Sequence, residues 1–204
     1  MTESLTAVLE RQRTRGLLGP GETEAHRAHG HGFAAMVDAC PDRALDLGSG
    51  GGVPGLVLAV DSWPNAELVL LDGSLRRCTY LELAVADLDV GDRVVVHWGR
   101  AEEAGHVDHL RGSQDAVVAR SFGPPAVTAE CAAPFLAPGG CLVVSEPPEG
   151  PAGRWDAGVL DLLGLAVEDS AQVDGAWFTR LRQGPACPLP YPRRAGLPAR
   201  RPLF

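Results

Sequence analysis

The sequence predicts an α/β fold in which helices cover both faces of a doubly wound, mostly parallel sheet. The first observation is a succession of five apolar segments from Arg43 onward, each followed by a segment of helical character. The second is that segments such as LVLL and VVV are apolar without alternation, as expected for strands buried on both faces. A chain of 204 residues is long enough for one such domain with additional elements.

Residues 1–40 are predicted to form a helical extension with a Gly/Pro-rich break in its middle. The two helices are expected at 3–15 and 22–39. Gly30 and Gly32 lower the helix propensity of the second helix.

Residues 41–183 are predicted to form the sheet and its covering helices. The strands of the five repeated units are expected at 43–49, 66–72, 93–99, 115–121 and 140–146. The helices that follow them are expected at 54–60, 74–88, 100–112, 124–136 and 154–164. Two further strands, near 165–173 and 176–183, have no helix between them and are expected to pair antiparallel at one edge.

Residues 184–204 are predicted to be an extended, Arg/Pro-rich tail, because they contain six prolines. The net charge of the chain is −8, which argues against indiscriminate binding of nucleic acid. The tail nevertheless carries PRRAGLPARRPLF, a segment with four arginines and no acid, and so offers a local basic face. An alternative is that the tail packs on the sheet as a strap.

Several classes of protein are disfavoured by composition. The sequence has no apolar run of membrane-spanning length and no signal pattern at its start, so a cytoplasmic protein without membrane partners is expected. The five cysteines are widely spaced without a CxxC pair, which predicts buried free thiols and no metal site. The histidines at 26, 29 and 31 are expected on a solvated helix face.

The segment LDLGSGGGVPG, residues 45–55, is the strongest candidate for a binding loop. Gly48 and Gly50 allow a tight turn and a close approach of the backbone to a ligand. Val53 stands where a dinucleotide fingerprint requires its third glycine. Asp46 would repel a pyrophosphate and instead suits a ligand that carries an amine. The alternative is a tight β-α turn that binds nothing.

Asp72 ends the next strand, 22 residues beyond Gly50, where an acid can accept both ribose hydroxyls. NAD enzymes also bind the ribose with an acid at this position, so Asp72 does not exclude NAD. Asp46 and Val53 are the residues that argue against an NAD site. S-adenosylmethionine has an α-amino group, a ribose and no phosphate, and is the expected cofactor. The D-x-G-x-G loop and the seven-strand layout resemble the Rossmann-like class I S-adenosylmethionine-dependent methyltransferases.

Two later strand ends add candidates. The turn GRAEE would lie beside the adenine, although Glu102 could equally be an acid that favours a helix start. The segment ARSFGPP lacks the Asn/Asp-Pro-Pro-aromatic sequence that enzymes methylating exocyclic amines often carry. Phe122 is a candidate for stacking on a base or for core packing. Arg120 directly follows an apolar strand, and arginine is rarely buried without a partner.

Five segments together resemble one family, the GidB/RsmG small-subunit ribosomal RNA guanine-N7 methyltransferases. They are LDLGSGGGVPGLVLA, LLDGSLRRCTYL, GRAEE, VVARSFGPP and YPRRAGLPARRPL. The resemblance implies an enzyme that methylates guanine N7 of ribosomal RNA, with Arg120 as the catalytic residue. The implied cofactor-binding residues are Asp46, Gly48, Ser49, Gly50, Gly52, Asp72, Gly73, Ser74, Arg77, Ala101, Glu102 and Arg120.

Two other functions stay open at this point. One is methylation of a small-molecule metabolite, and the other is an inactive methyltransferase fold that serves as a binding module. A monomer is expected, and ribosomal RNA is the expected macromolecular partner.

Overall fold

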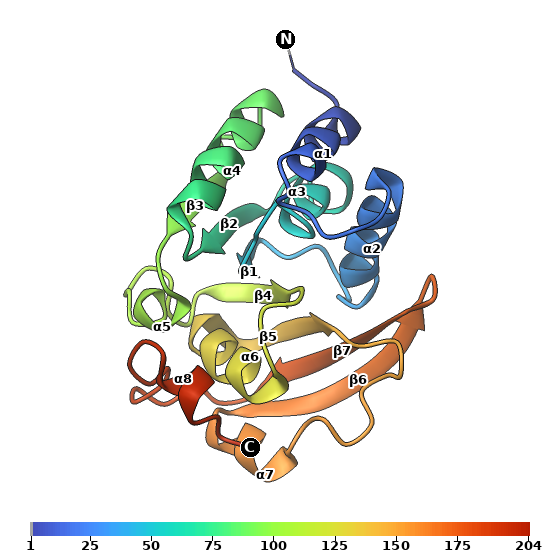
Figure 1. Cartoon of the computed structure of the whole chain (residues 1–204). Helices are drawn as coiled ribbons and strands as arrows, with labels where there is room; N and C mark the ends of the chain where they lie inside the picture. The colour runs from blue at the N-terminus through green and yellow to red at the C-terminus, as the bar shows by residue number, and fades with distance from the viewer. Residues whose placement is uncertain (1) are drawn as a thin grey trace.

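The computed structural model describes residues 2–204 and contains one seven-stranded sheet in the order β3-β2-β1-β4-β5-β7-β6 (Figure 1). Strands β1 to β5 all run parallel to one another, whereas β7 is antiparallel to both β5 and β6. The strands are β1 (Arg43–Leu47), β2 (Glu67–Asp72), β3 (Val94–Trp98), β4 (Gln114–Ala119), β5 (Leu136–Ser145), β6 (Leu165–Val173) and β7 (Ala176–Gln183). The predicted fold, with its antiparallel edge hairpin, is confirmed.

The helices follow the predicted order. They are α1 (Leu5–Thr14), α2 (Thr23–Ala35), α3 (Gly55–Val57), α4 (Leu75–Asp87), α5 (Ala101–Ala104), α6 (Pro125–Ala132), α7 (Ala157–Leu162) and α8 (Leu197–Arg200). Helix α3 continues as a π-helical turn, η1 (Leu58–Ser62), and α6 as a 3-10 turn, η2 (Ala133–Phe135). Within residues 2–204 no helix has the length and apolar character needed to cross a membrane.

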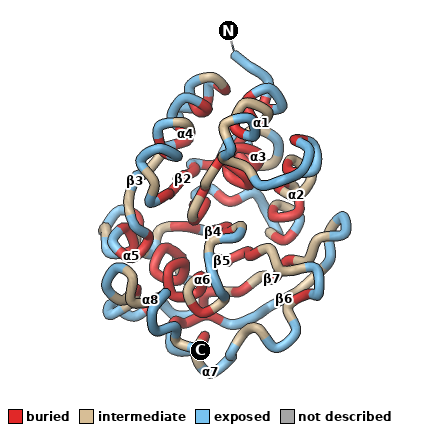
Figure 2. Tube along the Cα trace, viewed as in Figure 1, coloured by how far each residue is buried: buried red, intermediate tan, exposed pale blue. Residues whose placement is uncertain are grey.

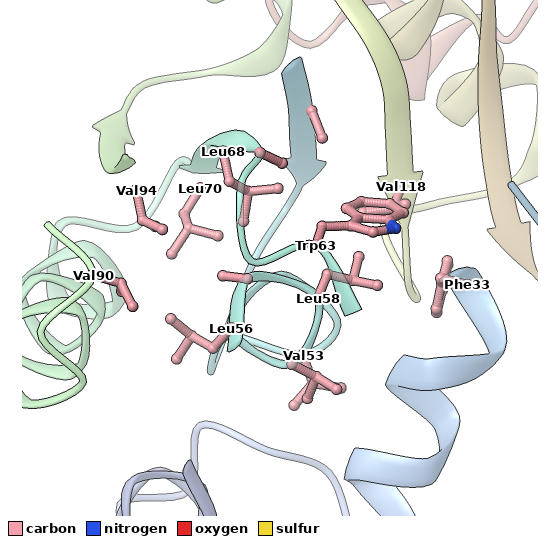
Figure 3. Close-up of a cluster of buried hydrophobic side chains, with 14 of the residues drawn as sticks. Phe33, Val53, Leu56, Leu58, Trp63, Leu68, Leu70, Val90, Val94 and Val118 are labelled. Carbon is pink, nitrogen blue, oxygen red and sulfur yellow. The ribbon is translucent and has the colours of Figure 1, made fainter. Parts of the chain in front are cut away.

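Two hydrophobic cores lie on opposite faces of the sheet, since successive side chains of a strand point to opposite sides. Ala44 of β1 belongs to the core under α1 to α4, whereas Leu45 and Leu47 belong to the core under α5 to α7. Figure 2 shows the buried central strands between exposed outer helix surfaces. Figure 3 shows part of the first core, where Trp63 and Leu58 pack near Val118.

Helix α2 approaches the sheet closely because of its glycines. A Cβ added at Gly30 would lie 2.8 Å from the Val57 side chain, and one at Gly32 would lie 2.4 Å from the Phe178 ring. The residues that weaken α2 as an isolated helix therefore allow it to pack against α3 and β7.

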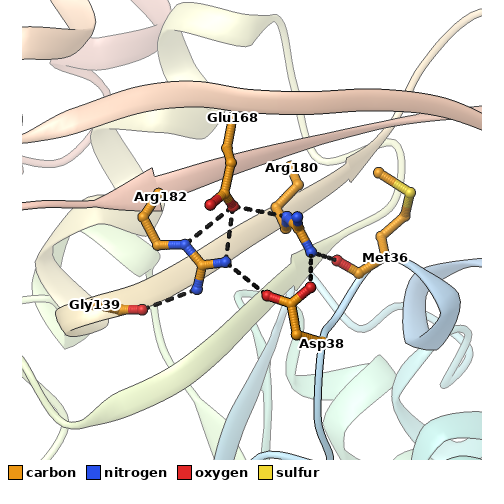
Figure 4. A network of polar contacts seen from close by, with 6 residues as sticks. All are labelled: Met36, Asp38, Gly139, Glu168, Arg180 and Arg182. Atoms are coloured by element: carbon orange, nitrogen blue, oxygen red, sulfur yellow. Dashed lines mark hydrogen bonds and ion pairs between the residues drawn. The ribbon is translucent and has the colours of Figure 1, made fainter.

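The segment after α2 is tied to the edge hairpin by a charged network (Figure 4). Asp38 pairs with Arg180 at 2.7 Å and with Arg182 at 3.1 Å, both on β7. Glu168 of β6 pairs with the same two arginines, each at 2.8 Å. This network joins the N-terminal helices to the last two strands.

Three sequence predictions need correction. The segment VVV is not buried on both faces, because β3 is an edge strand and Val95 is 59% exposed. The helix expected at 100–112 ends at Ala104 and continues as turns. Cys40 is exposed, although all five cysteines are free and the other four are buried.

The C-terminal residues return to the helices of the second core rather than running free. Arg111 donates to the carbonyls of Cys187, Pro188 and Tyr191 at 2.8 to 3.0 Å. Arg193 forms a bidentate pair with the buried carboxylate of Glu130. The segment is extended for most of its length, but it contains the short helix α8, which the proline content did not predict.

Candidate functional site

The candidate site lies at the carboxyl edge of the parallel strands, where β1 separates the strands that run outward in the two directions. The glycine loop follows β1, Asp72 ends β2, and Arg120 follows β4. These three segments are distant in sequence, and the topology brings them to one edge.

Two adjoining cavities border the glycine loop. We call the first the Asp72 pocket; its volume is about 340 Å³. Its lining residues are Gly48, Asp72, Gly73, Ser74, Arg77, Arg100, Ser121 and Phe122. The second, the Arg120 pocket, has a volume of about 240 Å³. Its lining residues are Leu17, Leu18, Gly19, Gly48, Ser49, Gly50, Gly51, Val53, Arg77, Arg120 and Ser121.

The loop itself has the tight geometry that its glycines predict. Gly48 and Gly50 have φ values of +76° and +57°, in the left-handed region that favours glycine. A Cβ at Gly48 would also lie 2.7 Å from the Phe122 ring. Gly48 lines both cavities, and the Phe122 ring leaves no room for a side chain there. Gly52 packs against Leu56 and does not line either cavity.

Asp46 lies beneath the loop and is almost fully buried. Its Oδ2 accepts a hydrogen bond of 2.9 Å from the backbone N–H of Gly55. Its Oδ1 is buried and has no hydrogen-bond partner among residues 2–204. Burial, with a further contribution from the charge of Asp72, raises the pKa of Asp46 to about 7. A buried carboxylate oxygen without a partner is suited to a ligand that donates hydrogen bonds or carries positive charge.

Asp72 forms one wall of the Asp72 pocket and is also buried. Its Oδ2 accepts from the N–H of Gly50 at 2.9 Å, and its Oδ1 accepts from the N–H of Ser74 at 2.8 Å. The guanidinium of Arg77 lies 3.5 Å from Oδ2. Arg77 donates to Oδ2 at that distance, so Oδ2 already accepts two hydrogen bonds, whereas Oδ1 accepts only one. Asp72 is thus rigidly held, and its Oδ1 retains capacity to accept from a ligand.

Ala101 and Glu102 do not line either cavity. The Oε1 of Glu102 accepts from Arg100 and from the backbone N–H of Gly196, each at 2.9 Å. Although burial acts to raise it, these two hydrogen bonds hold the pKa of Glu102 below its usual value. The side chain that reaches the Asp72 pocket from this turn is instead Arg100, which the sequence patterns did not single out.

Arg120 lines the Arg120 pocket and is paired with a histidine. Its Nη2 lies 3.0 Å from Nδ1 of His26, and Nε2 of His26 lies 3.1 Å from the carbonyl oxygen of Gly19. The prediction of a solvated histidine face is wrong for His26, which is only 4% exposed. It is also wrong for His29, whose ring packs against Phe33 and Phe178. The side chain of His31 is 43% exposed and pairs with Asp61.

A third cavity, the Trp155 pocket, adjoins the Asp72 pocket through Ser121 and Phe122, and its volume is about 270 Å³. It lies at the ends of β4 and β5. Glu146 is buried there, accepting a hydrogen bond of 2.7 Å from Trp155 Nε1 and pairing with Arg154. Phe122 lines both cavities and also packs against the second core.

A further cavity lies away from the glycine loop. One of about 340 Å³, lined by Arg43 and Arg93, lies at the starts of β1 to β3, on the edge opposite the glycine loop. Within residues 2–204 there is no group of three or more His, Cys, Asp or Glu side chains able to hold a metal ion.

Comparisons with known proteins place the chain in a family. The family model described as "GidB: rRNA small subunit methyltransferase G" matches residues 32–146. "Ribosomal RNA small subunit methyltransferase G" of Parasynechococcus marenigrum is 34% identical over 173 residues, which cover 78% of this chain and 67% of that protein. The protein of the same description from Moorella thermoacetica is 32% identical, with 84% and 73% covered.

Solved structures share the fold at low identity. The pyocyanin biosynthetic protein PhzM matches with a TM-score of 0.64 and 17% identity, over 89% of this chain and 62% of that one. A cofactor-bound protein from MTB matches with a TM-score of 0.61 and 19% identity, over 88% of each chain.

Proposed function

The chain belongs to the rRNA small subunit methyltransferase G family, and on that premise we propose that it transfers a methyl group from S-adenosylmethionine to small-subunit ribosomal RNA. The observation that carries the proposal is the pair of buried carboxylates at the glycine loop. Asp46 lies beneath the loop and lines neither cavity, but its Oδ1 has no hydrogen-bond partner among residues 2–204. Asp72 forms a wall of the Asp72 pocket, and its Oδ1 can accept a further hydrogen bond.

S-adenosylmethionine presents groups that fit this chemistry. Asp46 would accept from the α-amino group, and Asp72 from the ribose hydroxyls. Arg120, on the wall of the Arg120 pocket, would bind the carboxylate of the methionyl portion. Gly48, Ser49, Gly50, Gly73, Ser74 and Arg77 line the two pockets and complete the proposed binding set.

The acceptor is proposed to be guanine N7. This atom has a free in-plane lone pair and no proton, so the protein needs no general base for the transfer. The cofactor supplies a methyl group activated by its sulfonium. The protein would contribute by holding the base in line with that methyl group, which is the effect of proximity and orientation.

The Trp155 pocket is the proposed place for the base. Phe122 lies between this pocket and the Asp72 pocket, so a base stacked on its ring would face the methyl donor. An aromatic face also stabilises the positive charge that N7 methylation leaves on guanine. In this proposal Arg120 is catalytic because it fixes the methionyl end of the donor.

Exposed arginines near the pockets support a polynucleotide acceptor despite the net charge of −8. The side chains of Arg77 and Arg100 are 51% and 56% exposed where they line the Asp72 pocket. Gly196 bonds to Glu102, which brings the basic C-terminal segment beside the turn that holds Arg100. Arg194 and Arg200 are exposed on that segment and would contact phosphates of the RNA.

The experiment has two stages. Calorimetry with S-adenosylmethionine is expected to give saturable binding that Asp72→Ala weakens at least tenfold, with His31→Gln as a folded control. Small ribosomal subunits lacking the modification are then incubated with protein and donor, and the RNA is mapped by mass spectrometry. N7-methylguanine at one site supports the proposal. Donor turnover on a metabolite extract, with RNA unmodified, would establish the small-molecule alternative instead.

A further inference from the structure

His26 occupies a position that the methyl-transfer chemistry leaves unexplained. It belongs to α2, and its ring joins two segments of the site. Nδ1 faces the guanidinium of Arg120 at 3.0 Å, and Nε2 faces the carbonyl oxygen of Gly19 at 3.1 Å. A guanidinium can only donate hydrogen bonds, and a carbonyl oxygen can only accept them. Nδ1 must therefore be the acceptor and Nε2 must carry the proton.

This pattern defines one neutral tautomer of His26. The charged groups that face the ring are Arg120 from the end of β4 and Arg13 from α1, and both are positive. His29 of the same helix is a further neighbour on that side, and Glu10 of α1 is engaged by Arg13 and Thr23. Burial and the two arginines lower the pKa of His26, although the bond to Gly19 opposes this shift.

Gly19 belongs to the segment between α1 and α2 that covers the glycine loop. Leu17, Leu18 and Gly19 line the Arg120 pocket across from Gly50 and Gly51. The cover is close, since a Cβ added at Gly51 would lie 2.6 Å from Leu18 and 2.7 Å from the carbonyl oxygen of Leu17. The ring of His26 thus bonds to Arg120 and to Gly19, which lie on two different walls of the Arg120 pocket.

We propose that His26 is a positioning residue for the methyl-donor site, because its neutral ring fixes the Arg120 guanidinium and the 17–19 segment in one arrangement. This inference rests on the proposed function for its kinetic consequences, but the contacts themselves can be tested without activity. Among residues 2–204 the ring has no hydrogen-bond partner other than Arg120 and Gly19, so each bond can be removed separately.

Two substitutions separate the two bonds. The side-chain oxygen of Asn can take the place of Nδ1, so His26→Asn keeps an acceptor for Arg120 and loses the bond to Gly19. The side-chain nitrogen of Gln can take the place of Nε2, so His26→Gln keeps the donor to Gly19 and loses the acceptor for Arg120. His31→Gln, on the same helix and paired with Asp61, is the control.

The expected results differ between the variants. His26→Gln lowers kcat/KM at least tenfold while hydrogen exchange of residues 16–21 stays as in the wild type. His26→Asn retains kcat within about threefold, raises KM for the donor, and speeds exchange at 16–21. His31→Gln matches the wild type in all of these measurements. Kinetics equal to the wild type in both His26 variants, or losses that simply track a lowered Tm, overturn the proposal.

Two readouts probe the protonation state. Nitrogen NMR of the unliganded wild type is expected to show His26 neutral with the proton on Nε2, and a charged ring or the other tautomer overturns the assignment. As the pH falls, protonation gives the ring a second donor and a positive charge against Arg120, so kcat/KM should fall. His26→Asn should lack this contribution to the acid limb and keep only the one that protonation of Asp46 produces.

Failure of the proposed function would be distinguishable. A wild-type protein that neither binds S-adenosylmethionine nor methylates RNA refutes the proposed function. The role of His26 is then decided by its tautomer and by hydrogen exchange at 16–21 in the two variants.

Discussion

At the scale of single residues, Asp46 destabilises the folded protein when it is ionised and is suited to bind a cationic group. Its side chain is fully enclosed, one oxygen has no partner within residues 2–204, and its pKa is raised to about 7 by burial. A carboxyl group with a raised pKa is protonated at a pH where it would be charged in the unfolded chain. Ionising it in the folded protein therefore opposes folding unless a cationic group arrives.

The first prediction concerns donor binding and pH. Below pH 7 Asp46 is increasingly protonated, and a neutral carboxyl attracts an ammonium group poorly. Below pH 7 the affinity for S-adenosylmethionine is expected to rise with pH by as much as about tenfold per pH unit, because one proton is linked to binding. Above about pH 7 the affinity should level off. Calorimetry in buffers of different ionisation enthalpy should detect the released proton, and Asp46→Asn should remove both the proton release and the slope.

The second prediction concerns stability and His29, whose pKa is shifted in the opposite direction from that of Asp46. Burial lowers its pKa to about 4, with a smaller contribution from Arg120. A depressed pKa stabilises the folded state above the unfolded value near 6.5, and this stability is lost as the pH falls towards 4. His29→Phe, which keeps an aromatic ring against Phe33 and Phe178, should flatten the loss between pH 6.5 and 4 by about 1–3 kcal/mol. Urea unfolding at several pH values measures it, and an unchanged slope would contradict it.

The residues of the candidate site were predictable to different degrees. Asp46 and Asp72 carry local signals, one within the glycine loop and one at a fixed reach beyond it. The pairing of His26 with Arg120 joins residues 94 positions apart, so no local spacing could reveal it. The hydrogen bond from Gly196 to Glu102 is a similar case, because it depends on where the C-terminal segment returns.

At the scale of elements, the alternation of apolar and helical segments predicted the order of strands and helices well. It could not say which strand lies at an edge, and the apolar β3 therefore seemed a central strand although topology places it outermost. Helix α2 shows the reverse case. Gly30 and Gly32 weaken the local helix signal, yet both are needed for the contact with Val57 and Phe178.

A third prediction tests this packing. Gly32→Ala raises helix propensity by up to about 1 kcal/mol, but its methyl group would meet the Phe178 ring at 2.4 Å. Overpacking should dominate and lower the free energy of unfolding by about 1–3 kcal/mol. Gly158→Ala in α7 is the matched control, since the nearest atom to its added Cβ is an Asp156 oxygen at 3.4 Å. Chemical denaturation of both variants measures the difference, and a stabilised Gly32→Ala would refute the packing argument.

At the scale of the whole molecule, the C-terminal segment closes the second core. Cys187 belongs to that core, Arg111 donates to three carbonyls of the segment, and Arg193 neutralises the buried Glu130. The segment also reaches Glu102, beside the arginine that lines the Asp72 pocket. It thus connects the packing of α5 and α6 to one wall of the candidate site.

The fourth prediction follows from the Glu130–Arg193 pair. Arg193→Met leaves a fully buried carboxylate that keeps the backbone N–H of residue 193 but loses its charged partner, and should lower the free energy of unfolding by about 3–5 kcal/mol. The double variant Glu130→Met with Arg193→Met removes both charges and should recover most of that loss. Urea unfolding of the two variants checks this, and equal losses in both would show that the pair contributes packing alone.

The Glu130–Arg193 pair also affects the order in which parts of the protein pack as the chain is synthesised. Glu130 leaves the ribosome 63 residues before Arg193, its partner in the finished fold. Until Arg193 has emerged, burial of the Glu130 carboxylate is unfavourable, so the final packing of α6 against the sheet is disfavoured. We therefore expect the second core to be completed only after Arg193 has emerged, and the edge of the candidate site that depends on Glu102 and Gly196 to be completed with it.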